Sequence, residues 1–421
     1  MTLPSSELAR QPKLKSKVSF KQAATSLEYP NYRKWFIGQL ASLTGTWMQS
    51  TAQGFLVYQL TGSPAYLGLV AFAAGAPAWV FTLFGGVISD RMPRRTLLVI
   101  TQTTMMLLAF ILAWIVYIGF VQAWHVVVLA FLLGVANAFD APARMAFVTE
   151  LVDRPALSNA IALNSTMVTL ATIVGPAVAG LAYAAFGAAW CFTINAVSFL
   201  AVIVALLLMK MPKFIKPEQK TSALQNLREG FSYTRQHASI GVLLIMVAFT
   251  ALIGIGFMAL LPAWAVQVLK GDSATNGYLQ SARGVGSLIA AFSIASLGNI
   301  RIKGRILTIG SFLLPLMLIG WSFVTNVPIS LLFMVGIGTG FMLLTTMGNT
   351  LVQTLVEDRM RGRVSALYTL SFFGMMPIGS LSIGLLANTL GEPRAILISG
   401  IISLCVAVGM WWKAPHIRAL E

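Results

Sequence analysis

The chain has 421 residues, of which 57% are hydrophobic and only 10% are charged. A soluble domain carries about 25% charged residues, so the composition excludes a soluble enzyme, a disordered protein and a secreted disulfide scaffold. The net charge of +16 would suggest nucleic-acid binding in a soluble protein. Here the basic residues lie between apolar stretches, which indicates orientation in a membrane instead.

Twelve apolar segments are long enough to cross a bilayer, which takes about 20 residues per helix. A backbone in lipid must satisfy its own hydrogen bonds, so we expect helices rather than strands. The predicted fold is an all-α membrane protein whose twelve helices form two six-helix bundles. The segments are 35–60, 65–88, 96–118, 123–143, 159–185, 188–209, 240–266, 276–297, 306–325, 328–349, 364–388 and 395–412.

One polar interruption divides the helices six and six. It covers residues 210–238, carries six Lys or Arg residues, and includes a short helix expected at 223–233 on the membrane surface. The expected organisation is an N-terminal segment 1–34, a first bundle 35–209, the central loop 210–238, a second bundle 239–412 and a tail 413–421.

Basic residues accumulate on one side of the predicted membrane. Of the 29 Lys and Arg residues, 26 fall in the two ends of the chain and in the loops on their side. Lys270 and Arg394 fall on the other side, and Arg283 lies inside a segment. Basic loops stay in the cytoplasm, so we expect a multi-pass plasma-membrane protein with both termini cytoplasmic.

The two halves of the sequence resemble each other. The connection LTGSPAYLG at 60–68 matches LKGDSATNG at 269–277. Gly271 follows Gly62 by the same 209 positions by which Asn349 follows Asp140. A parallel duplication of six helices is typical of a two-bundle transporter whose site lies between the halves.

Residues 86–95 read GVISDRMPRR and lie between the second and third segments. They resemble the signature loop of the major facilitator superfamily, Gly-x-x-x-Asp-Arg/Lys-x-Gly-Arg-Arg/Lys, with Pro93 where the family usually has Gly. The motifs NYRKWFIGQ at 31–39, LTGSP at 60–64, DAPAR at 140–144, GPAVAG at 175–180 and RGRV at 361–364 are similar to the branch that includes enterobactin-type siderophore exporters.

This resemblance implies the major facilitator fold and a secondary active transporter that exports a bulky amphipathic small molecule by alternating access, in exchange for protons. It also implies a bacterial inner-membrane location. We expect a monomer that needs no cofactor, metal or nucleic acid. Motifs for catalysis are missing from the sequence, so an enzyme is not expected. The alternatives are a lysolipid or lipid flippase of the same fold and a non-transporting membrane receptor.

The signature loop has its own physical logic. Gly86, Asp90, Arg91, Arg94 and Arg95 place a carboxylate among guanidinium groups at a helix terminus, where ion pairs can lock one conformation and break in another. The alternative is ordinary basic residues of a cytoplasmic loop.

Asp140 and Arg144 form a second candidate pair with i, i+4 spacing at the expected end of the fourth segment. We predict a gating pair; the alternative is a plain surface pair. Mid-segment Asp, Glu and His residues are missing, so any proton coupling should depend on Asp140 first and Asp90 second. The alternatives are that transport runs down the substrate gradient, or that the substrate carries the proton.

Arg283 falls about seven residues into the eighth segment. A charge inside a membrane usually faces a cavity, so we predict a cavity cation that attracts an anionic group of the substrate. The alternative is a side chain that extends to the lipid headgroups.

Gln49 and Gln53 share one face near the middle of the unusually polar first segment, close to Trp47. The two amides, together with Trp47 as an aromatic wall, are candidates for substrate contact; the alternative is helix–helix hydrogen bonding. Asn137 and Asn164 are weaker candidates for the same cavity. Lacking a buried carboxylate, such a cavity suits a neutral or anionic substrate better than a cation.

Overall fold

The structure is a computed structural model that describes residues 25–211, 223–296 and 302–419, apart from a few side chains. Its regular elements in these ranges are all helices, as the sequence predicts. The expectations for 1–24, for 212–222 of the central loop and for the last two residues lie outside the described part.

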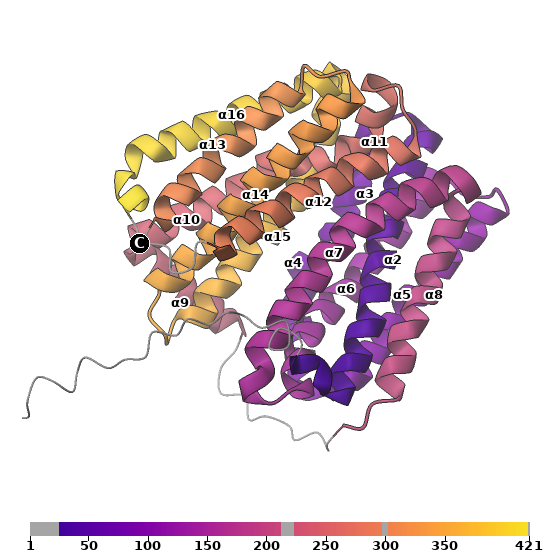
Figure 1. Ribbon diagram of the computed structural model, residues 1–421, viewed down its shortest axis with the longest axis horizontal. Coiled ribbons are helices and arrows are strands. Elements are labelled where there is room, and N and C mark those ends of the chain that lie inside the picture. The colour runs from indigo at the N-terminus through magenta and orange to yellow at the C-terminus, as the bar shows by residue number, and fades with distance from the viewer. Residues whose placement is uncertain (1–24, 212–222, 297–301, 420–421) are drawn as a thin grey trace, which may run out of the picture.

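The first half of the chain forms an N-terminal bundle, drawn from indigo to magenta in Figure 1. A short 3-10 turn, η1 (Thr25–Glu28), precedes its helices. The helices are α2 (Pro30–Thr61), α3 (Pro64–Gly75), α4 (Pro77–Arg91), α5 (Arg94–Tyr117), α6 (Ala123–Leu151), α7 (Arg154–Phe186) and α8 (Ala188–Leu207).

The second half forms a C-terminal bundle, drawn from salmon to yellow. Its first span is irregular and runs through α10 (Ala238–Phe249), a π-helix η2 (Thr250–Gly254), a 3-10 helix η3 (Gly256–Leu260), α11 (Leu261–Ala263) and a second π-helix η4 (Trp264–Val268). The remaining elements are α9 (Ala223–Gln236) before that span, then α12 (Ser273–Ser296), α13 (Lys303–Trp321), α14 (Val327–Leu355), α15 (Arg361–Leu390), α16 (Glu392–Lys413) and η5 (Pro415–Ala419).

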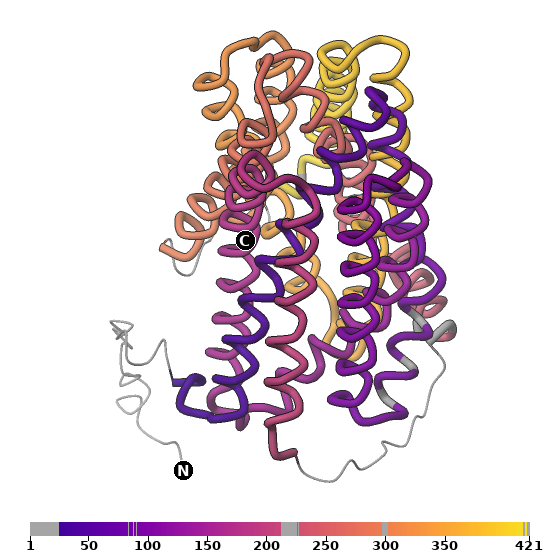
Figure 2. The backbone as a smooth tube through the Cα atoms, turned by 90° about the vertical axis from the view of Figure 1, so that its right-hand side faces the viewer, coloured from indigo at the N-terminus to yellow at the C-terminus, as the bar shows by residue number. Residues whose placement is uncertain are grey.

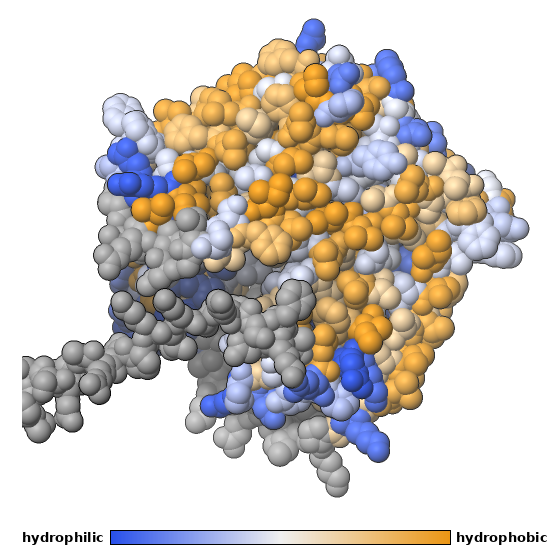
Figure 3. Space-filling model, in the orientation of Figure 1, coloured by the Kyte–Doolittle hydropathy of each residue, from blue (hydrophilic) through white to orange (hydrophobic). Residues whose placement is uncertain are grey.

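Among the described residues, the helices form twelve spans if α3 and α4 are counted as one span and the elements from α10 to η4 as another. Ten of them are long and apolar enough to cross a membrane by length and composition; α2 and α12 are long but more polar. Figure 3 shows apolar residues over the flanks of both bundles and hydrophilic residues gathered near their ends. The side chains of Trp114, Phe186 and Leu332 are each more than 60% exposed, which suits contact with lipid.

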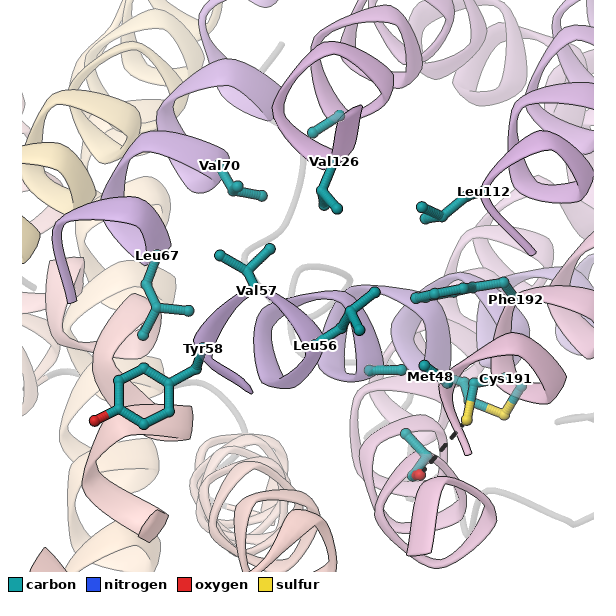
Figure 4. Close-up of a cluster of buried hydrophobic side chains, with 14 of the residues drawn as sticks. Met48, Leu56, Val57, Tyr58, Leu67, Val70, Leu112, Val126, Cys191 and Phe192 are labelled. Carbon is teal, nitrogen blue, oxygen red and sulfur yellow. Dashed lines mark hydrogen bonds between the residues drawn. The ribbon is translucent and has the colours of Figure 1, made fainter. Parts of the chain in front are cut away.

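One end of the molecule is called the basic side here; the helices that end there are α4, α6, α8, α12, α14 and α16. The other end of the molecule is called the opposite side. The start of α2 and the end of α8 meet on the basic side, where the Lys34 ammonium donates to the Leu208 carbonyl (2.9 Å). Figure 2 follows both helices along the N-terminal bundle. Near the opposite side of that bundle an apolar cluster holds it together, including Leu56, Val126 and Phe192, with the buried Cys191 thiol directed at the Ala179 carbonyl (Figure 4).

Two helix pairs join the bundles. In the α7–α12 seam, Gly277 packs directly on the Pro176 carbonyl; in the α3–α15 seam, Gly68 packs on the Ser380 carbonyl. Only glycine leaves room for backbones this close. Both contacts lie in the half of the molecule toward the opposite side, and Figure 1 shows the bundles diverging from there toward α9.

The helices extend beyond the predicted apolar segments on the basic side. The predicted fourth segment stops at residue 143, whereas α6 continues through Pro142 to Leu151. Its last turns pack into an apolar cluster with Trp35 and Leu98, so tertiary contacts rather than hydropathy set the helix end. The expectation that Asp140 lies at a helix end is therefore wrong: it lies eleven residues before the end of α6.

Candidate functional site

The two spans that are less apolar than the rest, α2 and α12, meet between the bundles. Polar side chains in a span avoid lipid because hydrocarbon offers them no partners. Thr51 of α2 donates a hydrogen bond to the Gln280 amide oxygen of α12 (3.1 Å). The amide nitrogen of Gln280 in turn donates to Asn276 Oδ1 (3.2 Å). A chain of polar groups thus crosses from one bundle to the other.

The faces of α12 show which side chains point between its neighbours. Toward α7, the Ser273 hydroxyl donates to the Gly180 carbonyl (3.1 Å) and the Ser281 hydroxyl to the Ile173 carbonyl (2.6 Å). Toward α14, Gly286 packs on the Val335 carbonyl. At 3.6 residues per turn, the face between these two contacts carries Asn276, Gln280, Arg283 and Ser287.

Arg283 is the one charged residue on this face, and its side chain is 8% exposed. Gly338 of α14, which lacks a side chain, packs directly on the Arg283 carbonyl and lets the two backbones approach closely. The Nε of Arg283 has no hydrogen-bond partner, and no carboxylate in the described part of the chain pairs with the Arg283 guanidinium. A guanidinium that reached the headgroups would be exposed, so its burial argues against that alternative.

One further amide on this face is also incompletely bonded. The Asn276 amide nitrogen is fully buried and has no partner. Each buried polar group without a partner destabilises the folded protein, typically by about 1–3 kcal/mol. A helix face that carries an unpaired amide and an unpaired guanidinium is suited to a ligand that supplies the partners.

Asp140 lies elsewhere, inside the N-terminal bundle between α5 and α6, and is fully buried. Its Oδ1 accepts hydrogen bonds from the Thr101 hydroxyl (2.8 Å) and the Gln102 amide (2.9 Å). Its Oδ2 lies 3.7 Å from Nε of the half-buried Arg144 and accepts no hydrogen bond. The predicted pair is therefore formed, but as part of a buried network rather than at a helix end.

The signature loop joins three helices on the basic side. Arg94, in the first turn of α5, forms an ion pair with Glu150 near the end of α6 (2.6 Å). Arg95 donates to the Leu207 carbonyl at the end of α8 (2.8 Å). Arg91 is exposed at the end of α4. The Asp90 side chain lies outside the described part, so its pairing stays a prediction.

Gly86 of the signature meets open space, since a β-carbon there would have no neighbour within 4 Å. The residue before it, Gly85, packs on the Ala138 carbonyl of α6, which leaves no room for a β-carbon. Sequence reasoning singled out Gly86 and missed Gly85, because the motif alone does not show which of two adjacent glycines faces a neighbour.

The other predicted cavity residues are dispersed. The Gln49 amide oxygen accepts a hydrogen bond from Asn195 of α8 (2.6 Å), which favours the helix–helix alternative. Gln53 is buried, and the β-carbon of Trp47 packs on Gly175 of α7. Asn164 is half-buried in α7.

Asn137 is exposed on α6. It lies on the same helical face as the buried Val126 and Ala130 of the N-terminal cluster. Thr51, Asn276 and Gln280 were missed by sequence reasoning. The spacing of 276, 280 and 283 along one helical face was the signal that would have found the last two.

Comparison with known proteins gives the same architecture. The sequence model of the family described as "Transmembrane secretion effector" matches residues 22–421. Among solved structures, a bacterial homolog of the human lysosomal transporter Spinster, inward-facing and unoccupied, has a TM-score of 0.70 at 14% identity and covers 95% of this chain and 98% of that one. A POT family transporter in complex with 5-aminolevulinic acid has a TM-score of 0.74 at 12% identity, covering 92% and 96%.

The chain matches curated transporters over nearly their full length. The staphyloferrin A transporter of Staphylococcus aureus is 25% identical over 377 residues, covering 89% of this chain and 94% of the relative. Macrolide efflux protein A of Streptococcus pyogenes is 22% identical, covering 90% and 96%, and the enterobactin exporter EntS of Shigella flexneri is 25% identical, covering 90% and 92%. The chain belongs to the transmembrane secretion effector family, a branch of efflux transporters in the major facilitator superfamily.

Proposed function

We propose that the protein exports an amphipathic small molecule that carries an anionic group, and that Arg283 binds this group between the bundles. The observation that carries the proposal is a guanidinium that is almost fully buried and has no described partner. A buried unpaired charge is unfavourable by several kcal/mol. An anionic ligand would provide a charge-assisted partner.

The outward direction is supported by curated relatives that are exporters, and the arrangement of the two bundles indicates the side on which this conformation is open. Hydrogen bonds between them, such as Ser63 to Asn388 (2.8 Å) and Thr51 to Gln280, lie toward the opposite side. The ion pairs of Arg94 with Glu150 and of Arg363 with Glu229, both in the basic half, join helices of the same bundle. Substrate would enter from the basic side, which we assign to the cytoplasm of a bacterium by its Lys and Arg content. Alternating access then releases it on the opposite side.

Proton coupling through Asp140 is the second part of the proposal. A coupled carrier needs a group that takes up and releases a proton as access alternates, and arginine does not deprotonate. Asp140 is a buried carboxylate with one oxygen that accepts no hydrogen bond. Asp90 is the second candidate. We propose that the carrier works as a monomer and that the loop with Arg91, Arg94 and Arg95 stabilises one of its two states.

The test is transport into inside-out vesicles that contain the purified protein. The panel contains amphiphiles of matched size that are anionic, neutral or cationic, with a lysophospholipid for the flippase alternative. Each is measured with and without a pH gradient. We expect the anionic compound to accumulate and Arg283→Gln to abolish that preference. Preferential transport of the cationic compound, or of lysophospholipid alone, would contradict the proposal.

A further inference from the structure

A continuous groove lies between α10, α13 and α16 in the C-terminal bundle, away from the seams with the N-terminal bundle. Its inner part has about 350 Å³ of empty space, its open mouth included, and apolar walls that include Phe249, Leu314 and Val406. Its outer part, with about 360 Å³ of empty space that also includes the open mouth, continues past Met410 to Arg418. The two parts share lining residues and form one groove. The shared residues are Met246, Ser311 and Ala407.

The local backbone explains why the groove opens here. Toward the opposite side, α13 and α16 are in close contact, because a β-carbon at Gly400 would lie only 2.7 Å from Ile319. At the same level of α16, the Ser399 hydroxyl binds the Ile253 carbonyl in the π-helix η2, which widens the first span of this bundle. The groove begins one turn further along α16, at Ser403.

The groove reaches lipid and has the length of one leaflet. Its walls come to the surface at Phe249, which is 40% exposed, and at Trp411, which is 45% exposed. The lining runs along α16 from Ser403 to Ala414, the residue directly after the helix, which is eleven steps along the chain. At 1.5 Å per residue this is roughly 16 Å, close to half of the roughly 30 Å hydrocarbon core.

The outer end of the groove is cationic. The Arg418 guanidinium lies over the Trp411 ring, 4.5 Å from its centroid. Gly304 packs on the backbone at Ile417 and Arg418, which brings the flanking Lys303 and Arg305 of α13 to the same end. In the described part of the chain, no carboxylate forms an ion pair with any of these cations.

We propose that this groove is a binding site for one anionic phospholipid of the leaflet on the basic side. An acyl chain occupies the apolar part between α13 and α16, and the phosphate binds at Arg418 beside Trp411. Two features together support this assignment. The apolar groove is as long as one leaflet, and it ends at clustered cations, so the distance between them matches the distance between the acyl chain and the phosphate of one lipid. Clustered basic residues at a membrane surface recognise anionic lipid heads in this way.

The experiment is native mass spectrometry of the full-length protein in detergent, titrated with phosphatidylglycerol or phosphatidylethanolamine. We expect phosphatidylglycerol to bind more tightly than phosphatidylethanolamine, and Arg418→Gln to weaken its binding about fivefold, the effect of one basic residue at a membrane surface. Arg154→Gln is the matched control, because Arg154 is exposed on the same side of the N-terminal bundle. It should bind phosphatidylglycerol like the wild type.

Ser403→Leu fills the deep end of the groove without changing charge, and we expect it to weaken retention of both lipids. Equal binding of the two lipids by the wild type would overturn the proposal. The proposal would also be overturned if Arg418→Gln and Ser403→Leu both bound phosphatidylglycerol as tightly as the wild type does. An equal loss of binding in Arg154→Gln and Arg418→Gln would overturn it too, because it would indicate a general effect of surface charge.

Discussion

Asp140 and Arg283 are both buried charges in the interior of a helix, one in each bundle, but their surroundings differ. Asp140 has two hydrogen-bond donors on one oxygen and Arg144 near the other. Arg283 has no described partner. A charge whose partners are built into the fold is held in place by the protein itself, whereas a charge without them depends on something that binds. This difference separates a proton-site candidate from a substrate-site candidate.

The largest expected effect is at Arg283. Arg283→Leu should reduce transport of an anionic amphiphile by at least about tenfold, because a charge-assisted contact to the ligand is lost. It should leave thermal stability equal or higher, since an unpaired buried charge is replaced by an apolar side chain. Both are measured on purified protein, by vesicle transport and by thermal unfolding. A large loss of stability would show that Arg283 has a structural partner, and the contrast with Asp140 would disappear.

Asp140→Asn tests the other half of the contrast. The asparagine oxygen can still accept from Thr101 and Gln102, so we expect the protein to fold. Its inability to exchange a proton should stop a pH gradient from driving accumulation, while downhill transport continues. Glu357→Gln, in an exposed ion pair with Arg359, is the matched control. If the gradient still drives accumulation in Asp140→Asn to the wild-type level, Asp140 is not the proton site.

Asp90→Asn should impair transport by an intermediate amount while the protein still inserts into the membrane. The reason is the predicted pairing of this carboxylate with guanidinium groups of the signature loop. Transport rates are normalised to the amount of folded protein in the membrane, measured by fluorescence-detected chromatography. Full transport by Asp90→Asn would remove the gating role and leave Asp140 as the remaining candidate carboxylate.

The smallest effect concerns the packing of α4 on α6 near Asp140. Gly85→Ala would place a β-carbon against the Ala138 carbonyl, and we expect a destabilisation of about 1–3 kcal/mol. Gly86→Ala has open space and should change stability by less than about 0.5 kcal/mol. Thermal unfolding of the two variants gives the comparison. Equal stability would mean that α4 can move away from α6 to make room for the β-carbon.

The sequence predicts the arrangement of spans well, because each span needs a long apolar stretch and the basic loops are distinct. It does not predict the helix ends, since α6 continues for two turns beyond its apolar stretch through tertiary packing around Leu151. Nor does it predict the π-helices of the first C-terminal span, where Ser399 of a distant helix binds a carbonyl of the widened turn.

The candidate site shows the same division. Arg283 was predictable because one charge in an apolar run is conspicuous. The burial of Asp140 was not, because it depends on Thr101 and Gln102 of the neighbouring helix. The cavity role of Gln49 was also undecidable from sequence, since either a substrate or Asn195 would satisfy its amide.

The central claim is tested most directly by the affinity of the purified protein for two amphiphiles that differ only in a carboxylate replaced by its amide. Isothermal titration of wild type and Arg283→Gln gives the four dissociation constants. The account predicts that the wild type prefers the carboxylate by about tenfold or more, equivalent to about 1.4 kcal/mol, and that Arg283→Gln has no preference. An equal preference in both proteins would contradict the assignment of Arg283 as the substrate's counter-ion.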